Sequence, residues 1–197
     1  IKVTPPWSHL VESDNTWEEY HQWMLDGSYF VNIIDDFVLN IRGHAGWLGS
    51  FSMDGLVAPS RKFCMGGTAH QDLLSGDKEP ISLRGYKEGA ILPKNKTTGC
   101  EGGVVFNKIV MEFRYLMLSN EIASMYVLGF AEAGNTWAPY DQYDPWTLKP
   151  SVGVGFKAFL PIGSLGVNFG YGFDRSLHTD PSNKVTVSWS AGMNSDR

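Results

Sequence analysis

The chain has 197 residues, of which 43% are apolar and 19% charged, and its formal net charge is −5. This balance excludes a disordered chain, and a net negative charge without a dense Lys/Arg cluster argues against a nucleic-acid-binding protein. No run approaches the roughly 18 apolar residues of a transmembrane helix.

Alternation of apolar and polar residues predicts seven strands, because successive side chains of a strand point to opposite faces. The run 122–133 fits least well, since it is apolar on both faces up to Glu132. The chain begins with a segment rich in proline and polar residues, 1–16, which is expected to be irregular. The predicted strands are 17–33, 36–49, 105–117, 121–133, 150–160, 164–173 and 184–193.

The last three predicted strands each have one wholly apolar face. The opposite faces of these three strands carry mostly glycine, serine, threonine, asparagine and lysine. A sheet of this kind presents its apolar face either to a protein core or to lipid. The side chains predicted to face lipid are Val152, Val154, Phe156, Leu165, Val167, Phe169, Val185, Val187 and Trp189.

The connections between the predicted strands favour the membrane interpretation over a soluble sandwich. Short connections at 34–35, 118–120 and 161–163 alternate with long ones at 50–104, 134–149 and 174–183. Outer-membrane barrels have short periplasmic turns and long extracellular loops, and the 22 glycines and 13% aromatic residues suit such a barrel. The fold class predicted is therefore all-β, a transmembrane antiparallel β-barrel.

Seven strands are an odd number, whereas bacterial single-chain barrels have even numbers. A lone set of seven would leave unpaired backbone groups in lipid at a cost of several kcal/mol each. We therefore expect the chain to lie within a longer protein whose other strands complete the barrel. Segment 1–16 is then the tail of a preceding extracellular loop.

The longest connection, 50–104, carries the most distinctive motifs. It holds the pair Gly66-Gly67 and, after 16 intervening residues, the triplet Arg84-Gly85-Tyr86. Carboxylates follow on two later strands, and the glycine-rich blocks 151–156 and 160–172 come after them. In this order, these blocks resemble the barrel of the BamA family of outer-membrane assembly factors. The resemblance covers about residues 17 to 193 and implies the final seven strands of a sixteen-stranded barrel.

The resemblance implies that segment 50–104 folds back into the barrel lumen. Arg84 would then pair with inner-wall carboxylates, namely Glu132, where the family usually has Asp, and Glu112. Gly85 would permit the turn, and Tyr86 would pack the loop tip against the wall. The motif alone favours a simpler interpretation, in which Arg84 is a solvated loop residue and Glu132 an ordinary lumen carboxylate, and it is the flanking blocks that favour the pair.

The resemblance also places function at the last strand, which pairs with the first strand of the barrel and opens to template a substrate strand. The residues concerned are Val185, Val187, Trp189 and Gly192. Family members usually end on an aromatic residue, whereas this chain ends with Asn194 to Arg197.

The function implied is insertion and folding of β-barrel proteins in the outer membrane of a Gram-negative bacterium. The partners implied are the lipid bilayer, unfolded outer-membrane proteins, the remaining strands and periplasmic domains of the same protein, and accessory assembly lipoproteins, with no nucleic acid. A related polypeptide-secretion pore and a passive porin-like barrel are the alternatives.

The sequence holds no catalytic motif and no metal-ligand spacing, so we predict neither an enzyme nor a cofactor or metal. The only two cysteines, Cys64 and Cys100, are far apart in sequence. A disulfide between them and a pair of free thiols both stay open at this point.

Overall fold

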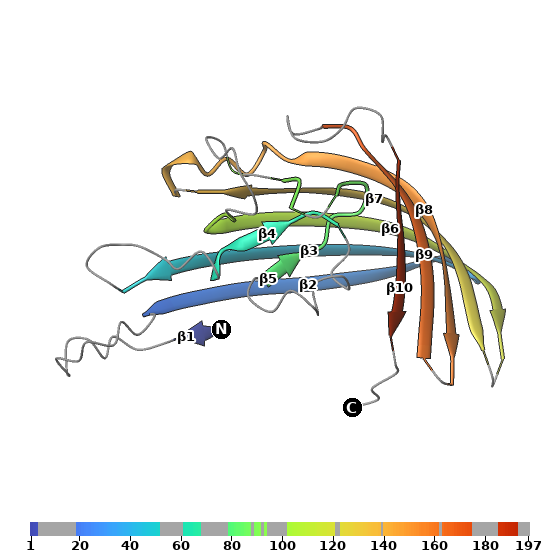
Figure 1. Ribbon diagram of the computed structural model, residues 1–197. Coiled ribbons are helices and arrows are strands. Elements are labelled where there is room, and N and C mark those ends of the chain that lie inside the picture. Colours follow the sequence, from blue (N-terminus) through green and yellow to red (C-terminus); the bar gives the residue numbers. More distant parts are fainter. Residues whose placement is uncertain are drawn as a thin grey trace.

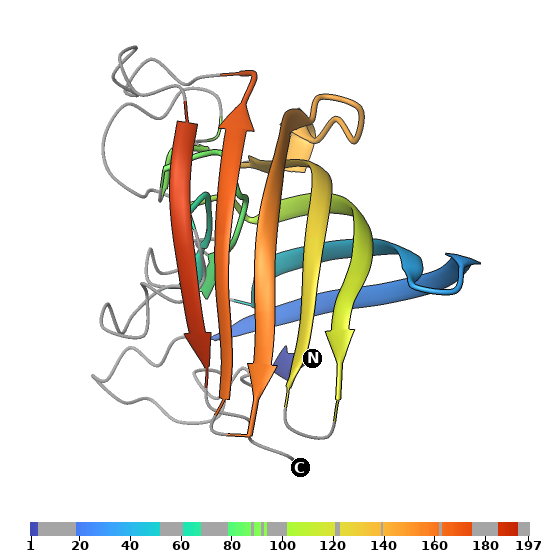
Figure 2. The same cartoon turned by 90° about the vertical axis from the view of Figure 1, so that its right-hand side faces the viewer.

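Eight strands form one antiparallel sheet in the order β1-β2-β3-β6-β7-β8-β9-β10, and the sheet is curved (Figures 1 and 2). This computed structural model describes residues 1–3, 19–51, 61–67, 79–87, 89–91, 93, 102–120, 123–138, 140–161, 163–174 and 185–192. The strands are β1 (Lys2–Val3), β2 (Tyr20–Ile34), β3 (Phe37–Ser50), β6 (Val105–Ser119), β7 (Ser124–Trp137), β8 (Lys149–Leu160), β9 (Gly163–Gly172) and β10 (Val185–Gly192).

A second, smaller sheet lies on the concave side of the large one. It consists of β4 (Phe63–Met65) and β5 (Glu79–Ile81), which run parallel to each other (Figure 1). Both strands come from the long connection between β3 and β6. Their apolar side chains form a cluster with the ends of β3 and β6, which consists of Leu48, Phe63, Met65, Ile81, Leu83, Tyr86, Ile91 and Phe106. This cluster holds the described parts of the connection against the inner wall.

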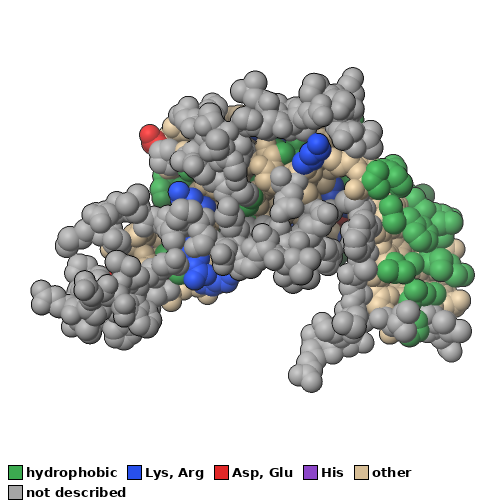
Figure 3. Space-filling model, viewed as in Figure 1, with side chains coloured by type: hydrophobic (Ala, Val, Ile, Leu, Met, Phe, Trp, Pro, Cys, Tyr) green, Lys and Arg blue, Asp and Glu red, His purple; other side chains and the backbone are tan. Residues whose placement is uncertain are grey.

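The two faces of the large sheet differ as the sequence predicts. On β8 and β9 the convex, outer face exposes Val154 (59%) and Phe169 (48%), and Figure 3 shows hydrophobic side chains over this part of the surface. The alternating inner residues Ser151 and Asn168 are 1% and 5% exposed. On β10, Val187 is 64% exposed; the side chains of Val185 and Trp189 lie outside the described residues.

Strand β3 carries an outward-facing aromatic residue near each end, Phe37 and Trp47. The two are ten residues apart, which spans about 33 Å along a strand and about 25 Å along the barrel axis at a tilt near 40°. That is the height of the apolar band of an outer-membrane barrel. Trp47 also pairs across the ladder with Trp23 of β2, which is 47% exposed.

Three predicted strand boundaries were wrong by three or four residues, namely the start of β2, which is Tyr20 instead of 17, and both ends of β7. Strand β7 occupies Ser124–Trp137 instead of 121–133. It begins late because Asn120 and Ala123 form a turn: the Asn120 N–H donates to the Ala123 carbonyl (3.0 Å), and the Ala123 N–H donates to Oδ1 of Asn120 (2.6 Å). At its other end, β7 stays paired with β6 through Trp137, although alternation is lost there.

The start of the chain also differs from the prediction of a loop tail at 1–16. Lys2 and Val3 form β1 and pair with Gln22 and His21 of β2. The remaining residues of this segment, 4–16, lie outside the described residues. The sheet therefore has seven long strands, as predicted, and one additional short strand.

The described connections lie as the sequence predicts, because consecutive long strands are all antiparallel. The turns at 35–36, 120–123 and 161–162 join strand ends on one side of the sheet, and the long connections join the opposite ends (Figure 2). One of the latter contains a three-residue 3-10 helix, η4 (Tyr140–Gln142). No helix among the described residues is long and apolar enough to cross a bilayer.

An arginine at Val167, central on the outer face of β9, should lower the free energy of unfolding in lipid vesicles by about 2–4 kcal/mol, because it places a charge in hydrocarbon. Phe173→Arg, just beyond the end of the same strand, is the depth control and should cost about 1 kcal/mol or less. Denaturant titration of the two variants measures the difference. Equal costs at the two positions would contradict a membrane-embedded outer face.

Membrane-impermeant labels added to intact cells should modify residues of the connection 138–148 and spare the turn 120–123, because these segments lie at opposite ends of β7. Single reactive residues placed at Asp141 and Asn120 would be compared, with detergent-opened cells as the control for reactivity. Preferential labelling of Asn120 in intact cells would invert the topology.

Candidate functional site

Two glycine-containing turns bring the tip of the long connection to the inner wall. Gly66 and Gly67 follow β4 with φ angles of 127° and 68°, and Gly85 has φ of 91°, all in the region that favours glycine. The Gly67 N–H donates to the Tyr86 carbonyl (3.0 Å), and the Leu83 N–H donates to the Gly67 carbonyl (3.1 Å). The glycine pair thus brackets the Arg84-Gly85-Tyr86 turn and fixes its direction.

Arg84 binds two carboxylates of the inner wall at once. Its backbone N–H donates to Oε2 of Glu132 (2.9 Å), and its Nε donates to Oε1 of the same residue (2.6 Å). A terminal guanidinium nitrogen pairs with Glu132 as well and donates to Oε1 of Glu112 (2.5 Å). Multiple charge-assisted bonds of this kind fix both position and orientation.

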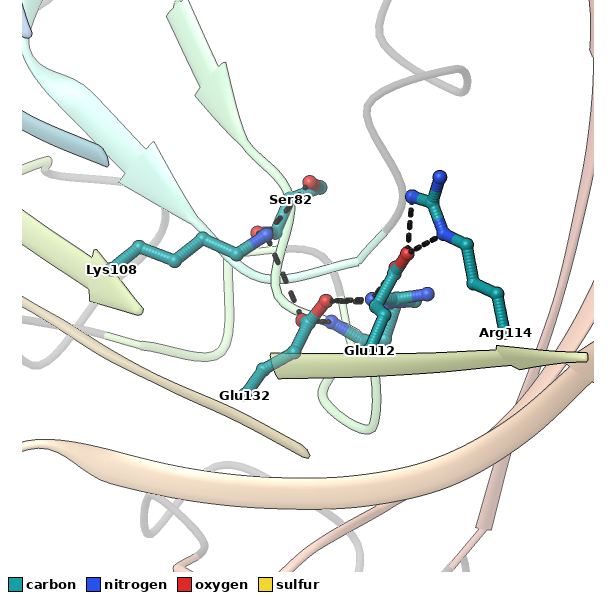
Figure 4. A network of polar contacts seen from close by, with 6 residues as sticks. Ser82, Lys108, Glu112, Arg114 and Glu132 are labelled. Carbon is teal, nitrogen blue, oxygen red and sulfur yellow. Dashed lines mark hydrogen bonds and ion pairs between the residues drawn. The ribbon is translucent and has the colours of Figure 1, made fainter. Parts of the chain in front are cut away.

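Two further cations extend the network, as Figure 4 shows. Arg114 donates to Oε2 of Glu112 through Nε (3.0 Å) and a terminal nitrogen (2.6 Å). Lys108 lies 3.6 Å from Oε2 of Glu132 and donates to the backbone carbonyl and the hydroxyl of Ser82, so it binds the wall and the loop together.

The centre of the network is shielded from water, whereas Arg114 at its edge is 28% exposed. Side-chain exposure is 1% for Glu132, 8% for Glu112, 11% for Arg84 and 9% for Lys108. The Phe130 ring packs 3.8 Å from the Arg84 guanidinium carbon, which adds a cation–π contact and excludes water from below. Because the ions are desolvated, removing one of them would leave an uncompensated buried charge.

Glycines on the inner face of β9 provide the space in which the turn docks. A Cβ at Gly170 would come within 2.6 Å of the Gly85 backbone nitrogen, and one at Gly172 within 2.7 Å of the Gly85 carbonyl oxygen. The Tyr86 hydroxyl donates to the Pro150 carbonyl (2.7 Å) and accepts from the Asp174 N–H (3.1 Å). The turn therefore lies directly on the backbone of the wall.

The structure brings together the five residues named from the sequence, Arg84, Gly85, Tyr86, Glu112 and Glu132, and their role in function stays a prediction. Sequence reasoning missed Lys108 and Arg114 as members of the network. The alternation of the sequence could have found them, since both lie on the same inner face of β6 as Glu112. It also missed the glycine seat, because a glycine in a sequence shows that space is needed but not what fills it.

The remaining predicted positions lie apart from this network. Strand β10, with Val185, Val187, Trp189 and Gly192, pairs along its whole length with β9, and the described residues contain no strand on its other edge. Cys64 lies on β4 and is not a free thiol, while Cys100 lies outside the described residues, so their pairing stays a prediction.

A family model described as the Omp85 superfamily domain matches residues 11–193, nearly the whole chain. The chain belongs to the Omp85 superfamily. This membership makes it part of an outer-membrane β-barrel of a barrel-assembly and translocation family. A search of curated proteins gave no match.

Among solved structures, the chain is similar to the crystal structure of BamA from Haemophilus ducreyi lacking POTRA domains 1–3. The TM-score is 0.61 at 17% sequence identity, over 89% of this chain and 36% of the BamA chain. At this identity the likeness shows the fold, and it confirms the predicted BamA-type barrel fold. The chain spans about a third of that relative's length.

The network of Arg84, Glu112 and Glu132 does not have the layout of a metal site, since each of its four carboxylate oxygens lies near a cation. No cluster of three metal-ligating side chains occurs within the described part of the chain. The chemistry that the geometry supports is mechanical, namely anchoring of a loop to the wall by ion pairs.

Replacing Arg84 with alanine should destabilise the docked loop by about 3–5 kcal/mol, because Glu132 would remain buried without its main partner. The matched control is Arg42→Ala. Arg42 also binds a carboxylate (Asp26, 2.6 Å), but the side chains are 51% and 40% exposed, so the loss should stay below about 1 kcal/mol.

Limited proteolysis within residues 79–93 reports the release of the loop, and denaturant titration reports the stability of the sheet. Similar effects of the Arg84 and Arg42 substitutions on loop cleavage would show that the buried network does not hold the loop.

Proposed function

We propose that this chain is the C-terminal part of a barrel that inserts and folds other β-barrel proteins in the outer membrane of a Gram-negative bacterium. The observation that carries the proposal is the loop anchored by Arg84 to Glu132 and Glu112, in a chain of the Omp85 superfamily. An anchored loop of this kind would support the wall during repeated opening of the barrel. A passive porin would need no such turn-to-wall lock.

The strand that would act on substrate is β10. It has one hydrogen-bonded neighbour, β9, whereas β9 has two, so one edge of β10 has free backbone groups within the described sheet. Free edges bind an added strand through main-chain bonds, whatever the side chains of that strand are. This property suits a machine that accepts many different barrel proteins.

The insertase would work without covalent chemistry. Its partners would be the lipid bilayer, unfolded outer-membrane proteins, and the remaining strands and periplasmic domains of the same protein, together with accessory lipoproteins. The outer face of the sheet provides the lipid contact, and the edge of β10 provides the substrate contact.

The competing function within the same superfamily is secretion of a partner polypeptide through the pore. A secretion pore would pass its substrate along the lumen, whereas an insertase would pair it with β10. The position at which a substrate crosslinks therefore separates the two.

A photo-crosslinking residue at Val187 of β10 should capture a stalled substrate barrel in the full-length protein. The same residue at Val167 of β9 is the control, because β9 is paired on both edges. Capture at Val187 of the protein's own first strand alone, and never of substrate, would refute the insertase and favour a static or secretory pore.

A further inference from the structure

The connection between β7 and β8 carries one of the most exposed aromatic side chains of the described chain, Trp146, at 91% exposure. We propose that this connection, 138–148, is a lipid-interface anchor, with the Trp146 indole inserted at the headgroup level of the bilayer that surrounds the sheet. The proposal rests on the outer-membrane placement given above and is independent of insertase activity.

The connection folds back onto the outer face of the sheet. Asn107 of β6 and Asn135 of β7 are cross-strand partners. The next pair on the same, outer face is Ile109 and Ala133. Asn107 Nδ2 donates to the Tyr143 hydroxyl (2.6 Å), and Asn135 Nδ2 donates to the Thr147 carbonyl (2.6 Å). The residues on both sides of Trp146 are thus fixed to outward-facing side chains.

The connection also covers a tryptophan of the strand beneath it. Trp137 continues the register row of Trp23, Trp47 and Val105. Trp23 and Trp47 are 47% and 38% exposed, but Trp137 is only 5% exposed. The Tyr143 ring packs edge-on against it, with ring centroids 5.0 Å apart. At β7, therefore, Trp146 of the connection supplies the exposed indole that Trp137 does not.

The turn that presents Trp146 is locally ordered by Asp144. Its Oδ1 accepts from the Trp146 N–H (3.1 Å), and its Oδ2 accepts from the Thr147 hydroxyl (2.6 Å). The Tyr140 hydroxyl donates to the Leu48 carbonyl and ties the connection to β3. The backbone that carries the Trp146 side chain is therefore fixed on the sheet.

Lipid is the occupant that the position favours. Trp137 lies ten residues beyond Val127 on β7, the same spacing as Phe37 and Trp47 on β3, so the connection lies at the upper limit of the apolar band. Two residues below Asn107, Ile109 is 52% exposed on the same face, so the anchor is continuous with the lipid-facing surface. Tryptophan prefers the membrane–water interface because its ring is apolar and its N–H is polar.

The test uses tryptophan fluorescence of the full-length protein folded in lipid vesicles. Emission of the Trp146→Phe variant, subtracted from that of the unaltered protein, isolates the signal of Trp146. We expect lipids brominated near the headgroup end of their acyl chains to quench most of this signal, and lipids brominated near the chain ends to quench less. Acrylamide in the aqueous phase should quench it only weakly.

Trp23→Phe is the matched control, because Trp23 is an exposed tryptophan on the outer face of the sheet itself. If brominated lipids quench the Trp23 signal but not that of Trp146, the sheet is in the membrane and the anchor is wrong. Quenching of neither signal would overturn the membrane placement and the anchor together. Strong acrylamide quenching of Trp146 would place it in water, and shielding from both quenchers would indicate a protein partner; either result refutes the anchor.

Discussion

Burial of Glu132 is the constraint on which the inner side of this structure depends. A carboxylate that is 1% exposed can stay charged only if cations and N–H groups replace water around it. Here a side chain and a backbone N–H of Arg84 supply most of that replacement, and both come from the connection rather than from the wall. The Glu132 carboxylate therefore has its main hydrogen-bond partners only when the connection is docked, so the ion network couples the position of the turn to the stability of the sheet.

The docked turn also depends on the absence of side chains at the glycines of the inner wall. Gly170 and Gly172 leave room for the Gly85 backbone, and Gly153 leaves room for the Phe130 ring that packs against Arg84. Any side chain at these positions would push the turn or the ring away from the carboxylates. The turn therefore binds to two neighbouring surfaces, the glycine face of β8 and β9 and the charged face of β6 and β7. This explains why β8 and β9 contain so many glycines, although glycine has a low β-propensity.

Most of the sheet could be predicted because the period-two pattern directly encodes which face each residue occupies, and the Arg84 contacts could be predicted through the family resemblance. Prediction failed where the pattern carries no such information. The end of β7 was missed because Gly134 and Asn135 are poor strand formers that the neighbouring ladder nevertheless retains. The place of Lys108 on the inner face follows from the pattern, but its bond to the Ser82 backbone carbonyl does not, because no side-chain pattern reveals a backbone partner. The exposure of Trp146 depends on how a connection folds back, which has no periodicity.

The contacts of the docked turn hold some strands of the sheet and not others. Arg84 joins β6 and β7 through Glu112 and Glu132. The Tyr86 hydroxyl joins the start of β8 to the segment just after β9, and the turn packs on Gly172 at the end of β9. One turn therefore clamps four neighbouring strands from the inside. Strand β10 receives none of the described contacts of this turn and is held by its ladder to β9. For the proposed insertase, opening at β10 would leave the buried ions intact, because separating β10 breaks backbone bonds without exposing Glu132. A gate between β6 and β7 would instead have to separate Arg84 from one of its two carboxylates, and an unpaired buried charge costs several kcal/mol.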